Sequence, residues 1–477
     1  MTTLTTNIAI GSGPRSPAET IPVLDPATGE VLDHIPAGDA ASADQAARRA
    51  RAAAPGWART PAAQRGAHLK AAAARARGHA DELAELQTRE NGKPLEDSRG
   101  GVEACLGAIE QYAELGPLHR GRALQGGWEA ADLMVHEPHG VVALLVPWND
   151  PLAIAGQGLA AALVTGNTVV LKPSERTPLA TLRLVELLDL PAGVLTLLLG
   201  DERAGRPLVE HEEVDCVMHT GSTDTGREIA QRCAAQLKKA VVELGGKDPL
   251  IVDAGVDPEW AAAQAATGAF ANAGQICTSV ERILCHRDVA EPFLAALARR
   301  AGELRMGPGL EAGTQLGPLI DAAQRDLVAR HVAEAVDAGA QVLAGGAPAE
   351  GPGFFFPATV LTDVPLDSAL MREETFGPVA PVSIVDDFDE AIAAANSTGY
   401  GLAATVLTAD QEHAQRAWRE LHAGTVKVNA VFGGAPGGAA HPRRASGLGL
   451  GYGPELLDEL TQVKVVHLEP APVQPTN

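Results

Sequence analysis

The amino-acid sequence predicts an α/β protein with two doubly wound parallel-sheet domains and a small additional β element. Three observations lead to this prediction. The chain has 477 residues, whereas a single hydrophobic core stops growing at about 250–300 residues. Strand-like apolar runs alternate with helical patterns, which is typical of parallel sheets covered by helices. Two further β-prone segments, 118–135 and 462–467, have no obvious strand partner nearby in the sequence.

The N-terminal part is expected to be irregular at first and then helical. Residues 1–35 are rich in Pro, Gly and Thr, so we expect an irregular arm with short turns such as Asp25–Gly29. Ala41–Tyr112 combines abundant alanine with interspersed charges, which is the pattern of packed helices. One break is expected in it, at Lys93–Pro94.

The next stretch predicts the first parallel sheet. Val141–Val146 is a continuous apolar run, as expected of a strand that is buried on both faces. Helical and strand-like patterns then alternate up to Glu243, which is typical of βαβ units. The further strands are expected at 168–171, 194–199, 214–218 and 240–243, and the helices at 152–164, 178–188 and 225–237.

A second alternating series follows Gly245–Gly246 and predicts the second sheet. Its strands are expected at 250–252, 283–284, 380–384 and 403–407, with helices that include 258–271 and 322–338. We therefore expect a first domain from 1–117 and 139–244, and a second domain from 245–440. The additional β element should combine 118–138 with 458–470, because β-prone segments without a local partner tend to pair elsewhere.

Charge and cysteine content exclude several classes of function. The net charge of −22 and the pI of about 5.0 give an acidic field that repels nucleic-acid backbones and anionic membranes. The five cysteines are scattered, with no CxxC pair and no zinc-like spacing, so we expect neither disulfides nor a metal site. Met1–Asn7 has no signal-peptide pattern, and no apolar run could span a membrane, so the cytoplasm is the expected location.

Two polar motifs follow predicted strands at the edge where open α/β sheets bind ligands. No GxGxxG fingerprint is present. Instead, Gly221 and Ser222 lie in a turn that enters a helix, where backbone N–H groups can hold a phosphate. The alternative is an ordinary serine helix cap. The segment Lys172-Pro173-Ser174-Glu175 offers a lysine and a carboxylate to ribose hydroxyls, or is simply a polar turn.

Further candidate residues lie in four short segments. Cys277 follows a Gly-containing loop and is a candidate nucleophile, although a lone cysteine is more often a small buried hydrophobe. The others are Glu243 before the glycine pair, Trp148–Asn149 after the first strand, and Glu374 and Phe376 in Glu373–Val379.

These segments, in this order and spacing, closely resemble the aldehyde dehydrogenase superfamily over nearly the whole chain. The resemblance points to the hydrolytic, NAD(P)-dependent branch, and it implies that Cys277 attacks an aldehyde. The Asn149 side-chain amide and the Cys277 backbone N–H would hold the oxyanion. Glu243 would activate the water that hydrolyses the thioester and could also deprotonate the thiol.

The resemblance also assigns a cofactor site. It places Lys172 and Glu175 at the adenosine ribose, Ser222 at the pyrophosphate, and Glu374 and Phe376 at the nicotinamide riboside. Trp148, Ser174 and Gly221 complete the predicted cofactor-binding set. A carboxylate at position 175 repels a 2′-phosphate, so we expect NAD as cofactor, with NADP possible. By the same resemblance, 1–117 with 139–244 is the cofactor-binding domain, 245–440 the catalytic domain, and 118–138 with 458–470 an oligomerisation element of a homodimer or homotetramer.

The chain departs from the family pattern near the substrate entrance. The usual Pro-x-Gly-Gly-x-Lys-x-Ser-Gly run is replaced by Ala439–Gly447, with His441-Pro442 in place of the glycines and Arg444 in place of the lysine. Only Phe432 offers an aromatic tunnel wall, while Asp150 and Gln157 are polar. A small polar aldehyde or a semialdehyde is therefore the expected substrate.

Two other functions remain open. A CoA-acylating aldehyde dehydrogenase would pass the thioester to a thiol, but such members generally lack the glutamate found here at position 243. A catalytically silent binding protein on the same fold is the second alternative. The joint presence of Cys277, Glu243 and Asn149 argues against it.

Overall fold

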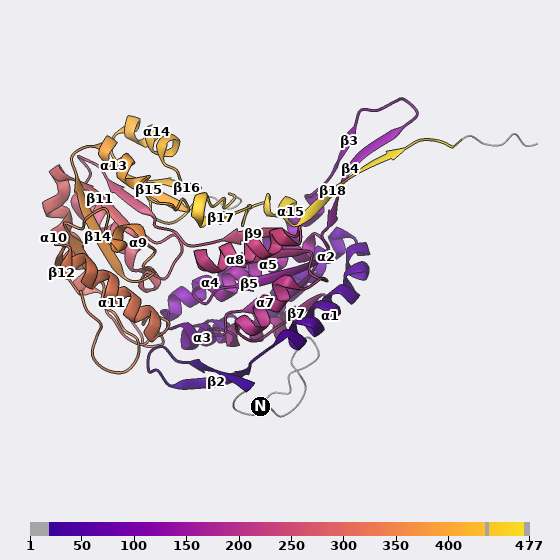
Figure 1. Cartoon of the computed structure of the whole chain (residues 1–477), viewed down its shortest axis with the longest axis horizontal. Helices are drawn as coiled ribbons and strands as arrows, with labels where there is room; N and C mark the ends of the chain where they lie inside the picture. The colour runs from indigo at the N-terminus through magenta and orange to yellow at the C-terminus, as the bar shows by residue number, and fades with distance from the viewer. Residues whose placement is uncertain (1–18, 435–437, 472–477) are drawn as a thin grey trace, which may run out of the picture.

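The computed structural model describes residues 19–434 and 438–471. Two parallel sheets form the cores of two lobes, and a narrow three-stranded sheet projects from one of them (Figure 1). This arrangement confirms the α/β prediction. The expectation for Met1–Asn7 falls outside the described residues. Among the described residues, no helix combines the length and apolar character that crossing a membrane requires.

The first sheet has the order β17-β9-β8-β5-β6-β7, and all of its pairs are parallel except β17 with β9. The strands are β5 (Val141–Val146), β6 (Thr168–Pro173), β7 (Leu195–Leu197), β8 (Cys216–Thr220), β9 (Lys239–Glu243) and β17 (Gly447–Leu448). Both faces are covered, because alternate β5 side chains enter different cores. Val142 and Leu144 pack with α4 and α5, whereas Val141 and Ala143 pack with α1, α7 and α8.

The helices of this lobe are α1 (Ala40–Arg59), α2 (Ala62–Arg77), α3 (Ala80–Asn91), α4 (Leu95–Leu115), α5 (Pro151–Val164), α6 (Leu179–Leu188), α7 (Glu202–Glu210) and α8 (Thr223–Ala235). The prediction of one break in 41–112 was wrong, because the segment forms four helices. Pro61 and Pro94 stand before α2 and α4, and the left-handed Gly92 (φ +81°) ends α3.

The second sheet has the order β12-β13-β14-β11-β10-β15-β16, parallel except for the β12–β13 pair. The strands are β10 (Pro249–Val252), β11 (Arg282–His286), β12 (Gln341–Ala344), β13 (Thr359–Thr362), β14 (Val379–Val385), β15 (Ala403–Leu407) and β16 (Thr425–Val428). The helices are α9 (Pro258–Phe270), α10 (Arg287–Glu303), α11 (Ala322–Asp337), α12 (Ala369–Arg372), α13 (Phe388–Ala395) and α14 (Gln411–Glu420).

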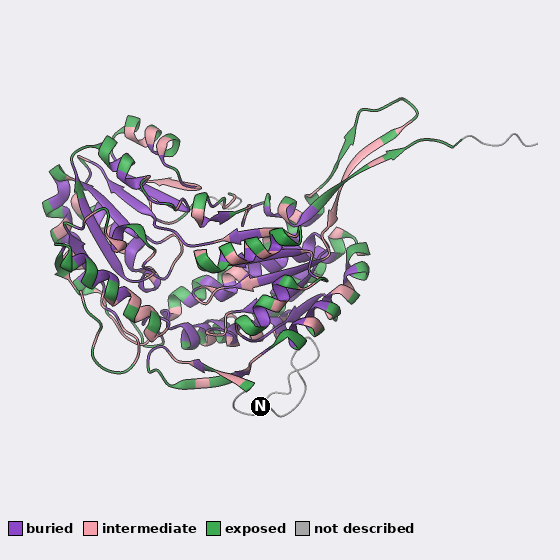
Figure 2. Ribbon diagram, in the orientation of Figure 1, coloured by how far each residue is buried: buried purple, intermediate pink, exposed green. Residues whose placement is uncertain are grey.

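The small three-stranded sheet, which we call the arm, consists of β3 (Arg122–Leu124), β4 (Ala131–Pro138) and β18 (Thr461–Leu468). The two segments that lack a partner nearby in the sequence therefore pair with each other, from Thr461 opposite Pro138 to Leu468 opposite Ala131. Most of the arm is exposed (Figure 2). The helical turn α15 (Leu456–Glu459) connects its base to the first lobe.

The prediction that residues 1–35 are irregular is partly wrong. Within its described part, β1 (Thr20–Leu24) and β2 (Val31–Pro36) pair as an antiparallel hairpin. The predicted turn at Asp25–Gly29 is its loop, in which the Gly29 N–H donates to the Asp25 carbonyl at 2.7 Å.

Candidate active site

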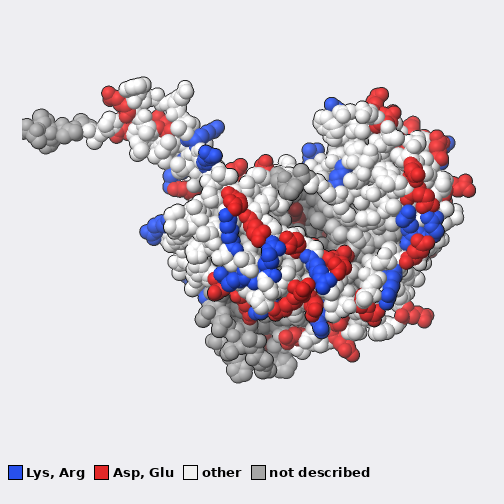
Figure 3. Space-filling model, turned by 180° about the vertical axis from the view of Figure 1, so that it is seen from behind, with Lys and Arg blue, Asp and Glu red and all other residues white. Residues whose placement is uncertain are grey.

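A cavity of about 570 Å³ lies at the carboxyl ends of β5, β6, β8 and β9. Its remaining wall comes from the second lobe, through Cys277, Gln324, Leu327 and the Glu374–Phe376 segment. Figure 3 shows the surface hollowed between the two lobes. The predicted residues in the cavity lining are Trp148, Asn149, Lys172, Ser174, Glu175, Gly221, Ser222, Cys277, Glu374 and Phe376. Glu243 is the predicted site residue outside that lining.

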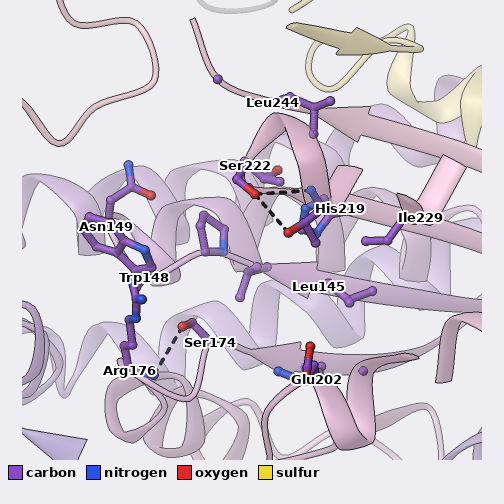
Figure 4. Close-up of a pocket in the computed structure, with 18 of the residues that line it drawn as sticks. Leu145, Trp148, Asn149, Ser174, Arg176, Glu202, His219, Ser222, Ile229 and Leu244 are labelled. Atoms are coloured by element: carbon purple, nitrogen blue, oxygen red, sulfur yellow. Dashed lines mark hydrogen bonds between the residues drawn. The ribbon is translucent and has the colours of Figure 1, made fainter. Parts of the chain in front are cut away.

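Two aromatic rings meet at one side of the cavity. Trp148, directly after β5, and Phe376 pack edge to face with centroids 5.3 Å apart. Arg176 places its guanidinium 5.9 Å from the Trp148 ring centroid, and Figure 4 shows the two side chains together. The arrangement gives the cavity an apolar wall with a cation beside it.

The turn after β8, at Gly221–Ser222, contributes polar groups to the cavity lining. Ser222 caps α8, because its Oγ accepts from the Thr225 N–H at 3.4 Å and donates to the Thr225 hydroxyl at 3.0 Å (Figure 4). The capping role and the cavity-lining position are therefore both present. At the preceding Gly221, a Cβ would come within 2.7 Å of the His219 ring, so a larger residue there would displace that ring.

His219 is buried in the lining, and neither of its ring nitrogens has a hydrogen-bond partner among the described residues. Burial lowers its pKa to about 4, and the charge of Lys172 contributes. Lys172 is itself buried and donates from Nζ to the Pro173 carbonyl at 3.0 Å. Burial lowers the pKa of that lysine, while Glu175 and Asp201 oppose the change.

Cys277 is partly buried at the end of a strained loop. Asn272 and Ala273 have left-handed backbones with φ of +49° and +54°, which non-glycine residues adopt rarely. The Asn149 side-chain amide donates to the Gln275 carbonyl at 3.0 Å, two residues before the thiol. Asn149 is thus fixed next to the loop, with its second amide hydrogen still available.

The electrostatic surroundings of Cys277 disfavour a free thiolate. Burial raises the pKa of the thiol to about 12, and the nearby carboxylates of Glu243, Asp248 and Glu374 act in the same direction. Lys427 in β16 carries a positive charge that interacts with Cys277. The thiol therefore needs a base before it can attack a carbonyl.

Glu243 at the end of β9 is placed to be such a base. Its Oε1 is buried and has no hydrogen-bond partner in the part of the chain that the structure describes, and burial raises the pKa of Glu243 to about 7. A Cβ on Gly451 would lie 1.5 Å from this oxygen, so the backbone after β17 closes tightly over the carboxyl group. A carboxyl group with a pKa near the working pH is well suited to proton transfer.

The segment that carries Glu374 and Phe376 is held from behind by a buried ion pair. Lys247 Nζ contacts Glu281 at 2.6 Å, and both side chains are almost fully buried. The Glu281 carboxylate also accepts from the N–H groups of Thr375 at 3.0 Å and Phe376 at 2.8 Å. Glu374 in turn accepts from the Gly246 N–H at 3.1 Å, and burial raises its pKa to about 8.

Several lining or supporting residues were missed by the sequence analysis. His219 could have been predicted from the sequence, because it places an imidazole at the end of an apolar strand. Lys427 also has a signal in the sequence, as a lysine between two valines in a β-prone run. Gln324, which donates to the Thr375 carbonyl at 2.9 Å and the Phe376 carbonyl at 3.0 Å, has none.

Known proteins are similar to this chain in sequence and in overall fold. A sequence model of the aldehyde dehydrogenase family matches residues 14–466. The chain is 38% identical over 464 residues to aminoaldehyde dehydrogenase 1 of Malus domestica, named as peroxisomal, across 94% of this chain and 92% of that protein. It is 38% identical over 468 residues to 3,6-anhydro-alpha-L-galactose dehydrogenase of Streptomyces coelicolor, across 95% and 94%. The crystal structure of betaine aldehyde dehydrogenase from Staphylococcus aureus in complex with NAD+ matches with a TM-score of 0.94 and 32% identity, covering 99% of this chain and 96% of that one. The predicted resemblance is confirmed, and the chain belongs to the aldehyde dehydrogenase family.

Proposed function

We propose that this chain oxidises an aldehyde to its carboxylic acid with NAD, through intermediates bound to Cys277 that water releases. The observation that carries the proposal is the meeting of Cys277, Asn149 and Glu374 in one cavity, with the buried Glu243 close enough to raise the pKa of the thiol. The presence of Glu243 also favours water over CoA as the acyl acceptor. The joint presence of Cys277, Asn149 and Glu243 argues against a catalytically silent binding protein.

The cavity residues fit a dinucleotide. The turn at Gly221–Ser222 opens α8, and the start of a helix favours a pyrophosphate. His219 has two buried nitrogens without partners, and buried polar groups normally find one. Lys172, Ser174 and Glu175 would hold the adenosine ribose, while Trp148, Glu374 and Phe376 would hold the nicotinamide riboside. When bound, NAD supplies a hydride acceptor for the aldehyde carbon.

The chemistry assigned to the protein follows from charge and burial. Glu243 takes the thiol proton, and Cys277 Sγ bonds to the aldehyde carbon. The resulting oxyanion receives hydrogen bonds from the Asn149 amide and the Cys277 N–H, which contribute about 3–4 kcal/mol each. Glu243 then passes the thiol proton to solvent, which restores its carboxylate. After the oxidation, this carboxylate takes a proton from water, which attacks the thioester and releases the acid, and Glu243 returns that proton to the departing Cys277 sulfur.

An acceptor assay tests the hydrolytic route. One carboxylic acid should form per NADH without CoA, and added CoA should neither accelerate turnover nor yield an acyl-CoA. Cys277→Ala should abolish NADH formation, whereas Cys285→Ala, a change at a fully buried cysteine, should not. A CoA requirement, or turnover by Cys277→Ala, would contradict the proposal.

The cofactor preference is proposed from Glu175. Its carboxylate would accept from ribose hydroxyls and repel a 2′-phosphate, so NAD should be preferred to NADP. Glu175→Ser should lower the ratio of kcat/KM for NAD to kcat/KM for NADP. The expected decrease corresponds to about 1–3 kcal/mol. A wild-type preference for NADP would exclude this role.

The substrate is proposed to be a polar aldehyde without positive charge, and an ω-carboxy semialdehyde fits best. Lys427 is half-buried, donates from Nζ to the Val431 carbonyl at 2.8 Å, and lies 5.4 Å from the Phe432 ring centroid. Val431 packs beside Val280, near the Cys277 loop, because a Cβ on Gly268 would touch both valines. Lys427 thus brings a cation close to the nucleophile and to the aromatic residue expected in the tunnel wall.

The neighbouring Asp248 opposes this charge less than an exposed carboxylate would. Burial raises the pKa of Asp248 well above its usual value, which disfavours the charged form of the group. One of its oxygens accepts from the Ala403 N–H at 3.0 Å, and the other is buried without a partner. Aminoaldehydes and betaine aldehyde, named for two of the similar proteins, are cationic compounds. Lys427 would repel them.

A charge series tests the substrate class. Aldehydes of equal length that end in carboxylate, methyl or trimethylammonium should have kcat/KM values in that order. Lys427→Met should lower the carboxylate-to-ammonium ratio about tenfold, which corresponds to about 1.4 kcal/mol. It should leave the methyl compound nearly unchanged. Lys464→Met, at an exposed lysine of the arm, is the control. If the wild type prefers the ammonium compound, the assignment is wrong.

We further propose the division of labour expected from the sequence. Residues 1–117 and 139–244 bind the cofactor, 245–440 carry the nucleophile, and 118–138 with 458–470 form the contact of a homodimer or homotetramer. A cytoplasmic location is supported by five free thiols, since disulfides are rare in reducing compartments. Acidic and basic side chains are interspersed on the face in Figure 3, which fits a small-molecule enzyme without a nucleic-acid partner.

A further inference from the structure

Three potential metal ligands meet where the arm joins the first lobe. His119 follows the helical turn Gly116–Leu118, His136 lies in β4, and Asp458 lies in α15 (Figure 1). One ligand atom from each side chain lies within 4.8 Å of the others. The two imidazole rings have centroids 4.2 Å apart.

Hydrogen bonds define which nitrogens point at the carboxylate. The Thr461 hydroxyl donates to the Leu457 carbonyl at 2.9 Å, so its single hydrogen is used. The hydroxyl must then accept from His136 Nδ1, which lies 3.1 Å away. A neutral His136 therefore has its lone pair on Nε2, 4.0 Å from Asp458 Oδ1. Two acceptors face each other there, and a cation between them would satisfy both.

His119 completes the arrangement from the other side. Its Nε2 lies 2.8 Å from the same Asp458 oxygen, and its side chain is mostly buried, whereas Asp458 is largely exposed. An ion could therefore enter from solvent and be held by inward-facing imidazoles. The fixed Nδ1–H of His136 resembles the outer hydrogen bond that orients metal-bound histidines.

We propose that His119, His136 and Asp458 bind one divalent transition-metal ion, such as Zn²⁺, at the base of the arm. Bonds of about 2.0–2.2 Å in a tetrahedron separate ligands by about 3.3 Å. The observed distances of 2.8 Å and 4.0 Å to Asp458 Oδ1 lie on both sides of that value. The ligand set of two imidazoles and one carboxylate leaves a fourth position for water.

The bound ion would connect the segment around Asp458 to the segments around His119 and His136, which lie far from it in the sequence. Asp458 lies three residues before β18, whereas His136 belongs to the β4 strand that pairs with it. A metal bond between them fastens the C-terminal strand to the hairpin at one end. Its role would be structural, since the site is built from the arm base and not from the cavity that contains Cys277.

Metal titration of untagged protein tests the site. Because Cys277 is also a potential ligand, the titration uses Cys277→Ala protein stripped with a chelator. Zn²⁺ in competition with a chromophoric chelator should reveal one site per chain. In the Cys277→Ala protein, a second substitution, His136→Ala or Asp458→Asn, should weaken Zn²⁺ binding at least tenfold. His467→Ala is the matched control, because this exposed arm histidine contacts Asp132 and Glu469.

Two further measurements keep the proposal falsifiable. Co²⁺ should give the visible absorption of a tetrahedral nitrogen and oxygen site without a thiolate charge-transfer band. His119→Gln serves as a third variant in case another one folds poorly, with circular dichroism as the check. Zn²⁺ affinity that is unchanged in folded His136→Ala and His119→Gln proteins, or the lack of any stoichiometric site, would overturn the proposal.

Discussion

At the scale of single residues, the base that we propose is Glu243, whose pKa depends on its burial. Burial raises its pKa to about 7, so the carboxyl group changes charge within the working range of most enzymes. The ionised form is the one that can accept a proton, and it becomes more abundant as pH rises through 7. A rate limited by this base therefore increases with pH and then levels off.

We expect Glu243→Gln to separate the two halves of the reaction. The amide cannot take a proton from water, so a burst of about one NADH per site should survive while steady turnover collapses. In the wild type, deacylation should rise about tenfold between pH 6 and pH 8, and Glu243→Gln should lose this dependence. A slower burst that recovers at higher pH would show that the glutamate also deprotonates Cys277.

Stopped-flow and steady-state NADH absorbance provide the measurement. Glu373→Gln is the matched control, because it makes the same change at a largely exposed carboxylate. Near-normal steady turnover in Glu243→Gln would show that another base activates the water.

His219 gives a second prediction at this scale. His219→Phe should weaken NAD binding several-fold, because one net hydrogen bond contributes about 0.5–1.5 kcal/mol. The same change should keep or raise the melting temperature, since it removes buried nitrogens without partners. Calorimetric titration with NAD checks the expected loss of affinity. Thermal denaturation of the apoprotein checks the expected melting temperature. Unchanged affinity would mean that the ring does not contact the cofactor.

At the scale of elements, the buried Lys247–Glu281 pair fixes the segment that contains Glu374 and Phe376. Removing one member leaves the other as an uncompensated buried charge. We expect Lys247→Met to lower the free energy of unfolding by about 3–5 kcal/mol and to raise the KM for NAD. Arg299→Met breaks an exposed pair with Glu259 and should cost about 0–1 kcal/mol. Urea denaturation compares the two variants, and equal losses would refute the special role of the buried pair.

Elements were predictable where burial makes the sequence distinctive. The central strand β5 is an uninterrupted apolar run on both faces, and its predicted bounds agree with the structure. The edge strand β12 has only four residues and is mostly exposed, and the four-residue strand β16 is interrupted by a lysine, so neither gives a long apolar run. The hairpin of β1 and β2 was missed for the same reason.

The site was predictable to the extent that its chemistry lies in short motifs. The motifs at Lys172 and Ser222 both reach the predicted cavity, because carboxyl ends of parallel strands share one edge of a sheet. Contacts made by residues far apart in the sequence were not predictable. The closure of Gly451 over Glu243 and the bond from Gln324 to the Phe376 carbonyl depend on how the folded chain brings distant segments together.

At the scale of the whole molecule, the arm extends away from both lobes (Figures 1 and 2). Its strand β18 exposes Val463 by 51% and Val465 by 66%. These residues alternate along the strand, so they lie on one face. An apolar face on a projecting sheet fits a contact with another copy of the chain.

We expect Val463→Asp together with Val465→Asp to shift the protein to a smaller oligomer, because two charges would be buried in the contact. Deleting the tail from Thr461 should act in the same direction. Gln462→Asp, an equally exposed change on the opposite face, should have little effect. Light scattering after size exclusion measures the mass. An unchanged mass in the double variant would place the contact elsewhere.

The short strand β17 has a consequence for biosynthesis. It comes after the whole second sheet in the sequence, yet Gly447 pairs with Glu243 at the edge of the first sheet. A ribosome adds about 5–20 residues per second, so the interval between residues 277 and 451 lasts on the order of tens of seconds. The nascent chain therefore contains Cys277 well before it contains Gly451, whose backbone closes over Glu243. The surroundings of Glu243 that raise its pKa are therefore complete only when translation has nearly finished.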